Sequence, residues 1–277
     1  VGESFPQLGR FLGRSTDKQA VLRLLQRLAK PHEQVAGARL AVAEAAMAAD
    51  DDALALGEAR AAAKLRPGWE RAALVEGTIL SKGAPAETIA HYRSFLETYP
   101  KSREIRTSLA RVLVTERDAD GARKELQTLV NDHPNNAEVI YAVGLLSMQL
   151  EDWPLAETHL KRLLALDFQD RDLVRLYLGQ IAEERKTFAD ALARYREIQG
   201  GEHFLTAQIR QSAVIAKQGD VEAARSILQQ ASAANNEQRL QLILAETQLL
   251  RDANKTSEAF GVVERGLDKL PSHPDLL

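Results

Sequence analysis

The chain has 277 residues, a net charge of -3 at pH 7 and no cysteine, which excludes disulfides, thiolate metal sites and cysteine nucleophiles. Its 36 basic and 39 acidic residues provide no strongly basic surface, so we expect no nucleic-acid partner. No apolar run reaches the length of a membrane-spanning helix, and we expect no membrane span. Aromatic residues make up 5% of the chain while alanine and leucine abound, which favours packed helices over sheets.

The N-terminal segment shows a pattern of small residues that ends in a proline. Gly9 is followed by Ala20 and then by Pro31, with apolar residues at helical spacing between them. This order predicts two helices joined by a turn, and we treat residues 1-35 as a degenerate first repeat. In the next segment, "ADDDA" at 49-53 is interpreted as a helix-capping turn, because Asp side chains accept hydrogen bonds from free backbone amides.

From there on the same pattern recurs at a nearly constant spacing. Small anchor residues recur every 33 to 35 positions, at Ala55, Thr88, Ala122, Ala156, Ala191, Ala224 and Ala259. A second small residue stands twelve positions before most anchors, as Gly179 does before Ala191, and a proline stands twelve positions after four of them. Because proline ends a helix, these positions predict repeats at 36-68, 69-102, 103-136, 137-171, 172-204, 205-239 and 240-273. Residues 274-277 are expected to begin a truncated further repeat.

No motif in the chain indicates catalysis. The stretch "RDADG" at 117-121 lacks the closing carboxylate of a calcium loop, because Gln127 stands where the bidentate Glu is needed. We interpret it as the inter-helix turn of the fourth repeat, with Gly121 supplying conformational freedom. Nucleotide-binding, zinc-protease and serine-hydrolase motifs are absent, and no two histidines stand at the i, i+4 spacing of a helical metal site. We therefore expect no catalytic residue, no metal and no cofactor, and predict that the chain is not an enzyme.

The repeated pattern resembles that of the tetratricopeptide repeat (TPR) family. The resemblance is carried by first-helix pairs and second-helix residues such as Val143-Gly144, Leu178-Gly179, Tyr92 and Tyr195. It implies an all-α fold without a sheet, a right-handed α-α superhelix (TPR solenoid) of about eight helix-turn-helix repeats. We expect this array to be a single domain over residues 1-277. In physical terms, small residues let the two helices of a hairpin approach closely, and each hairpin needs neighbours to bury its apolar face.

The resemblance also implies where a partner binds. In TPR arrays the first helix of each hairpin lines the concave face, where a peptide or a helix is bound. The strongest candidates at the inward positions are Met47, Arg111, Tyr141, Leu145, Met148, Leu176, Tyr177, Gln180, Glu184 and Arg210. Further inward positions hold Glu183, Ile209, Lys217 and Gln248. The alternative is that some of these residues belong to the inter-helix core. No asparagine occupies these positions, so the Lys/Asn carboxylate clamp of chaperone-binding TPR proteins is absent.

These observations predict a non-enzymatic scaffold that binds other proteins. The Ala/Leu/Arg-rich array is also similar to the outer-membrane TPR lipoproteins of Proteobacteria that act as adaptors for carboxyl-terminal processing proteases. That resemblance implies a protease and its periplasmic cell-wall hydrolase substrates as partners, and a periplasmic, outer-membrane anchored location in the full-length protein. The lipid-modified cysteine of such a protein is not in this chain.

Other readings of the sequence stay open. One is a TPR assembly factor for pilus, secretion or outer-membrane biogenesis, and another is an enzyme whose catalytic domain lies outside these residues. A cytoplasmic location is the alternative to the periplasm. Exposed terminal repeats also predict self-association.

Overall fold

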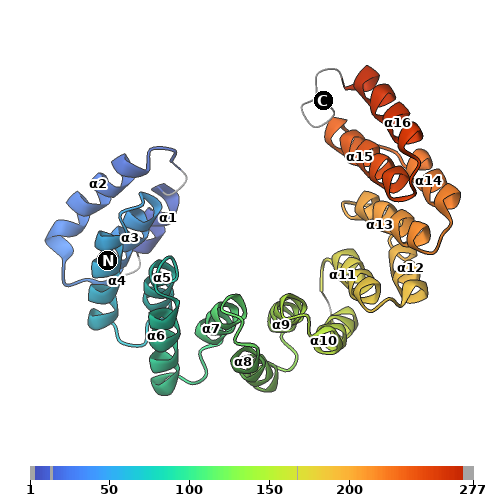
Figure 1. Ribbon diagram of the computed structural model, residues 1–277. Coiled ribbons are helices and arrows are strands. Elements are labelled where there is room, and N and C mark those ends of the chain that lie inside the picture. The colour runs from blue at the N-terminus through green and yellow to red at the C-terminus, as the bar shows by residue number, and fades with distance from the viewer. Residues whose placement is uncertain (1–3, 13–14, 167, 271–277) are drawn as a thin grey trace. The chain divides into compact units, whose positions relative to one another are not determined.

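A computed structural model describes residues 4–12, 15–166 and 168–270 of the chain. These residues are helical throughout apart from turns and short connections, and the described part contains no β-strand, as the sequence predicted (Figure 1). The chain forms two compact units, Val1–Glu151 and Asp152–Leu277. The expected single array over 1-277, with its repeat boundaries, stays a prediction. The start of a further repeat at 274-277 lies outside the described residues.

Unit 1 is built from consecutive helices of 9 to 14 residues: α1 (Ser4–Leu12), α2 (Lys18–Ala29), α3 (Ala36–Ala48), α4 (Asp52–Leu65), α5 (Glu70–Leu80), α6 (Pro85–Thr98), α7 (Arg103–Thr115), α8 (Ala119–Asp132) and α9 (Ala137–Gln149). A short 3₁₀ helix, η1 (Lys30–His32), follows α2. Helices that follow one another pack together, as α3 and α4 do, while α1 and α2 both pack against α3 (Figure 1).

Unit 2 continues in the same way with α10 (Trp153–Ala165), α11 (Arg171–Glu184), α12 (Phe188–Arg196), α13 (Phe204–Lys217), α14 (Val221–Gln230), α15 (Asn236–Asp252) and α16 (Thr256–Lys269). The pairs α11 and α12, α13 and α14, and α15 and α16 form the most extensive helix contacts of this unit (Figure 1). The first helices also contact one another, since α13 packs against α15. Within each unit we call the side formed by the first helices of the hairpins the first-helix face of that unit. These helices are α3, α5, α7 and α9 in unit 1, and α11, α13 and α15 in unit 2.

Aspartates begin many of the second helices. In each case the carboxylate accepts a hydrogen bond from the backbone N–H three residues later, which satisfies one of the free amides of the first turn. These N-cap residues are Asp17, Asp51, Asp118, Asp152 and Asp220. Asp51 lies in the "ADDDA" stretch, so the expected capping turn is confirmed.

Most of the turns between the helices of a hairpin contain one residue with a left-handed backbone. Its φ lies near +60°, in the left-handed region that side chains other than Asn, Asp and Gly rarely adopt. The residues are Asp50, Arg117, Glu151, Lys186 and Asn254, and Gly219 takes the corresponding position before α14. The expectation for Gly121 was therefore wrong. The left-handed residue of that turn is Arg117, and Gly121 lies in the first turn of α8, where its N–H donates to Asp118.

The first and second helices of a hairpin touch at the small residues. A Cβ added at Gly179 would lie 2.2 Å from the Tyr195 ring, and one at Gly77 would lie 2.2 Å from the Tyr92 ring. In the hairpin of α13 and α14, the Ser212 hydroxyl donates to the carbonyl oxygen of Ala224 at 2.8 Å. The expected close approach is thus present, but the group that fills the space over Gly179 is the Tyr195 ring.

Candidate protein-binding surface

The first-helix face of unit 1 carries a shallow hollow of about 250 Å³. It is lined by residues of three first helices: Leu74 from α5, Thr107 and Arg111 among others from α7, and Val139 and Ala142 from α9. Arg111 is exposed at this hollow. An ion pair between Arg103 and Glu138, at 3.3 Å, joins α7 to α9 beside it. The hollow therefore combines an apolar floor with charged groups at its edge.

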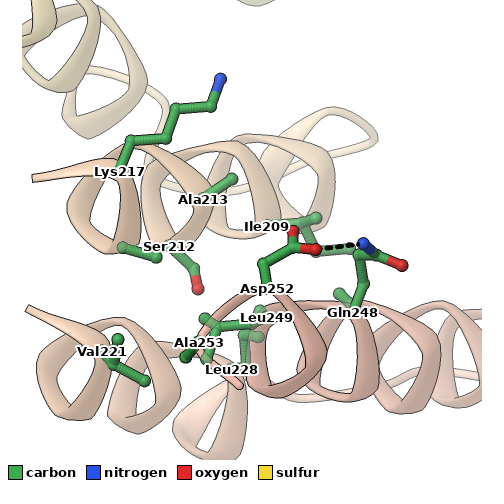
Figure 2. A pocket seen from close by; sticks show the side chains of 12 residues that line it. Ile209, Ser212, Ala213, Lys217, Val221, Leu228, Gln248, Leu249, Asp252 and Ala253 are labelled. Atoms are coloured by element: carbon green, nitrogen blue, oxygen red, sulfur yellow. Dashed lines mark hydrogen bonds between the residues drawn. The ribbon is translucent and has the colours of Figure 1, made fainter. Parts of the chain in front are cut away.

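In unit 2, a pocket of about 380 Å³ opens between α13, α14 and α15 (Figure 2). Its walls are mostly small or aliphatic: Ile209, Ala213, Ala216, Val221, Leu228, Ala245, Leu249 and Ala253. Alanines on both α13 and α15 leave the space between the two helices unfilled, because their methyl groups reach only a short distance from the backbone. We call this space the α13–α15 pocket. Its volume is within the range of pockets that bury a ligand group.

Several polar residues of this pocket already form hydrogen bonds or ion pairs within the protein. The Gln248 side-chain amide donates to Asp252 at 2.6 Å along one edge, and the Ser212 hydroxyl is occupied by the carbonyl of Ala224. Lys217 extends away from Ser212 and Leu228 in Figure 2. Its stem lines the pocket while its ammonium group lies 3.3 Å from Glu183 of α11.

Glu183 is the least expected residue of unit 2, because its carboxylate is buried. The side chain is 3% exposed. Its carboxylate accepts a hydrogen bond from the Tyr195 hydroxyl at 2.5 Å. Arg210 and Lys217 approach the same carboxylate, at 3.7 and 3.3 Å. Burial, and then the hydrogen bond to Glu183, holds the pKa of Tyr195 well above its ordinary value, so the hydroxyl stays a neutral donor. We call these four residues the Glu183 cluster.

Most of the sequence-predicted site residues have accessible side chains. Arg111, Glu184 and Arg210 are exposed, and the residues of intermediate burial are Met47, Tyr141, Leu145, Met148, Tyr177 and Gln180. The structure brings Arg111 to the hollow of unit 1 and Arg210 to the Glu183 cluster. Whether any of them contacts a partner stays a prediction.

Leu176 requires a correction. It was predicted to line the binding face, but it is 5% exposed and belongs to a core cluster with Ala207 and Val214 of α13. A first helix packs against its own second helix and against the neighbouring first helix. More of the circumference of a first helix is therefore buried than the single apolar face of a surface helix. Leu176 lies on this buried part of α11.

Sequence reasoning missed the lining of the α13–α15 pocket except for Ile209, Lys217 and Gln248, which stand at predicted inward positions. The alanines that create the space look like ordinary helix residues in the sequence. The signal that could have identified them is the pairing of small residues on consecutive first helices, Ala213 and Ala216 on α13 with Ala245 on α15.

A second hollow in unit 2 is a weaker candidate. It measures about 510 Å³ and lies against α10, α11 and α12. Most of its charged residues pair with one another: Glu157 with Lys161 and Arg185, and Arg194 with Glu197. Because Asp190 brings the acidic side chains of the lining to the same number as the basic ones, this surface offers no excess charge for a ligand.

Comparison with known proteins places the repeats in a family. The tetratricopeptide repeat family matches residues 80–146 and again residues 141–202. A TPR repeat-containing protein of Pseudomonas aeruginosa is 34% identical over 106 residues, which make up 38% of this chain and 18% of that protein. These matches over residues 80–202 support assignment of the chain to the tetratricopeptide repeat superfamily. The matched part spans less than a fifth of the relative's length.

Solved TPR structures share the fold at low sequence identity. A tetratricopeptide repeat protein from Parabacteroides merdae has a TM-score of 0.58 and 16% identity, covering 86% of this chain and 94% of its own. Pseudomonas aeruginosa pilF has a TM-score of 0.52 and 16% identity, covering 70% of this chain and 89% of its own. Yeast Tom70 has a TM-score of 0.54 and 14% identity, covering 92% of this chain and 57% of its own. These similarities support the all-α TPR fold.

Two kinds of feature are absent from the described residues. None of the helices among them combines the length and the apolar character that crossing a membrane requires. Within the same residues, no group of three or more His, Asp or Glu side chains is placed to hold a metal ion.

Proposed function

We propose that this TPR chain is a scaffold that binds a protein partner along its first-helix face, with the partner's segment lying across successive first helices. TPR repeats support an interaction role in general. The observation that supports this face is the α13–α15 pocket, an unfilled apolar space between two first helices with charged residues at its edge.

The physical basis is the burial of apolar surface together with a few oriented polar contacts. Pockets that combine an apolar lining with a few polar groups are the usual sites for anchor side chains of a ligand. Helices held by packing on both sides present these groups at little cost in conformational freedom. Half-buried Met47, Tyr141 and Tyr177 add adaptable contact residues of the kinds enriched in interfaces.

At a finer level we propose an adaptor role, in which the chain recruits a carboxyl-terminal processing protease together with its cell-wall hydrolase substrates. This proposal includes a periplasmic, outer-membrane anchored location of the full-length protein. The support for this adaptor role is the overall resemblance of the repeat array to the TPR lipoproteins of Proteobacteria. The Pseudomonas relative adds no support for the role, because it is described only as a TPR repeat-containing protein.

The alternative is a TPR assembly factor for pilus, secretion or outer-membrane biogenesis. The fold shared with Pseudomonas aeruginosa pilF is compatible with this alternative. At 16% identity it supports the fold alone. The partner therefore has to be identified by experiment.

The test is affinity capture from cells of the source organism, followed by direct binding of each captured protein to the purified chain. Arg111→Glu reverses a charge on the first-helix face, and Arg93→Glu makes the same change at an exposed position of a second helix, α6. We expect Arg111→Glu to weaken binding of a genuine partner by roughly tenfold, the effect of one charged contact. Arg93→Glu is expected to bind like the wild type.

The outcomes separate the proposals. Equal binding by both variants would contradict a partner on the first-helix face of unit 1. Capture of a carboxyl-terminal processing protease that binds the purified chain would support the adaptor role. Capture of pilus, secretion or outer-membrane assembly proteins in its place would support the alternative and remove the adaptor role.

A further inference from the structure

The α13–α15 pocket lies where the Glu183 cluster lies one repeat earlier. In that cluster, Glu183 of α11 and Arg210 of α13 meet between two first helices, and the Tyr195 hydroxyl reaches Glu183 from the second helix α12. The residues 33 to 35 positions further along the chain all line the pocket, and they are Ala216 of α13, Leu228 of α14 and Ala245 of α15. The pocket is therefore open because three large side chains are replaced there by two methyl groups and one isobutyl group.

The polar groups of the pocket lining already have partners within the protein. The Ser212 hydroxyl donates to a backbone carbonyl of α14, and the Gln248 amide donates to Asp252. The Lys217 ammonium group lies 3.3 Å from Glu183. Among the described residues that line the pocket, the charged ones are Lys217 and Asp252, and their charges cancel. The group that matches this interior is an uncharged hydrocarbon, because burying a polar group without a partner is unfavourable.

The pocket is elongated along its two first helices. Its lining runs from Ile209 to Lys217 on α13 and from Ala245 to Ala253 on α15. A helix segment of this length rises about 12 Å. Figure 2 shows α13 on one side of the space and α15 on the other. This shape favours a linear group over a compact ring.

The size of the pocket exceeds that of one amino-acid side chain. An apolar cavity of about 150 Å³ holds a benzene molecule, which corresponds to about 25 Å³ per carbon atom. On this scale the pocket volume of about 380 Å³ accommodates roughly 10 to 15 carbon atoms. A leucine or phenylalanine side chain of a protein partner would leave much of this volume unfilled, whereas a linear chain along α13 and α15 would fill it.

We propose that the α13–α15 pocket binds the aliphatic chain of a small amphiphile with an uncharged head group, and that roughly 10 to 15 carbon atoms of this chain are buried. The chain lies between α13 and α15, and the head group stays in solvent at the open side. Burial of the methylene groups provides the binding free energy. The inference goes beyond the proposed function, because it assigns a small-molecule ligand to this site.

The first experiment measures the binding of alkyl maltosides to the purified chain by titration calorimetry, below the concentrations at which they form micelles. The alkyl chains have from about 6 to about 18 carbons, a range that brackets the estimated capacity. We expect one saturable site whose affinity rises about fourfold with each added methylene group. The affinity should level off at roughly 10 to 15 carbons, where the chain fills the pocket.

The same titrations contain the outcomes that would overturn the inference. An affinity that rises over the whole series would indicate adsorption to exposed apolar surface. Absence of saturable binding would leave the pocket to a side chain of the protein partner. Tighter binding of a carboxylate or a quaternary ammonium with the same alkyl chain would contradict the uncharged head group. In the wild type, the methyl resonances of Ile209, Leu228 and Leu249 should shift on binding, and shifts confined to other residues would also overturn the inference.

Filling the pocket provides a second test. Ala213→Leu places three further carbons at the pocket wall, and we expect it to weaken binding of decyl maltoside by at least about tenfold, because it displaces two or more methylene groups of the ligand. Ala189→Leu makes the same change at an exposed position of α12 and is expected to bind like the wild type. Thermal melts establish that each variant is folded.

A double variant rebuilds the side chains of the preceding repeat. Ala216→Glu with Ala245→Arg places an ion pair where Glu183 and Arg210 stand one repeat earlier, and it is expected to abolish binding in a folded protein. This variant replaces Ala213→Leu if that substitution unfolds the chain. Unchanged binding by either folded variant would overturn the inference. The proposed function would survive that result, because Arg111→Glu tests it separately in unit 1.

Discussion

Gly179 and Tyr195 form a size-matched pair at the contact of α11 with α12, and Gly77 and Tyr92 repeat it at the contact of α5 with α6. Each glycine leaves room for a tyrosine ring that is almost fully buried. In the hairpin of α7 and α8, by contrast, Ala110 occurs with Leu126, and both are fully buried. In these three hairpins, the smaller first-helix residue therefore occurs with the larger second-helix side chain.

Gly179→Ala tests this pairing. The added methyl group would meet the Tyr195 ring at 2.2 Å, and we expect a loss of about 1–3 kcal/mol in the free energy of unfolding. Gly57→Ala is the matched control, because a Cβ at that exposed helical position meets nothing within 4 Å. It should raise stability by up to about 1 kcal/mol through helix propensity. Thermal melts that shift the same way for both variants would contradict the pairing.

His159 provides a pH-dependent contribution to stability. It is buried in α10, and its Nδ1 has no hydrogen-bond partner among the described residues. Burial, followed by the nearby charge of Arg162, lowers the pKa of His159 below its ordinary value of 6.5. As the pH falls below 6.5, the unfolded chain binds a proton before the native chain does. The stability is therefore complete above this pH and is lost as the pH falls toward the native pKa.

The expected slope is at most about 1.4 kcal/mol per pH unit from this group. Urea titrations of the wild type and of His159→Leu at pH 7.5 and 5.5 measure it. We predict that the wild type loses more stability than the variant over this interval. An equal loss in the two proteins would show that His159 is protonated in the native chain as readily as in the unfolded one.

At the level of elements, four of the hairpin turns, those before α4, α8, α10 and α14, combine an aspartate cap with a left-handed residue. The caps are recognisable in the sequence, since "ADDDA" contains the N-cap Asp51. The left-handed residue is not, because Arg117, Glu151 and Lys186 have none of the conformational preference of glycine. The left-handed conformation at this position is imposed by the helices on either side. The residue type therefore gives no signal of it, and the only glycine nearby, Gly121, was taken as the flexible residue of the turn.

Arg117 gives a direct measure of this strain. A left-handed residue other than Gly, Asn or Asp costs about 1–2 kcal/mol. Arg117→Gly removes that cost but increases the freedom of the unfolded chain, so we expect a net gain of up to about 1 kcal/mol. Arg117→Val should lose more than about 1 kcal/mol, because a β-branched side chain tolerates φ near +60° least. Chemical denaturation of the two variants measures these opposite changes in the free energy of unfolding.

The sequence predicted the helical elements better than it predicted the candidate site. Small residues, capping aspartates and prolines act locally along the chain, so Gly179, Asp51 and their equivalents could be read from spacing. The burial of Glu183 could not, because it depends on Tyr195 of α12 and on Arg210 and Lys217 of α13. Leu176 was misplaced for a related reason, since a helix covered on several sides has no single buried stripe.

At the scale of the whole molecule, the proposed binding function depends on surfaces that no single repeat contains. The hollow of unit 1 is lined by three first helices, and the α13–α15 pocket by two hairpins. Such sites arise only where hairpins are stacked, which explains how a fold built from similar units can bind different partners.

The central claim is that a partner binds across the first helices. Hydrogen–deuterium exchange of the chain with and without its captured partner tests this claim most directly. We predict added protection in first helices, in α7 for a partner that uses Arg111 and in α13 and α15 for a partner that uses the α13–α15 pocket. The second helices α8 and α16, which line neither the hollow of unit 1 nor the α13–α15 pocket, should change little. Protection confined to these second helices would contradict the account.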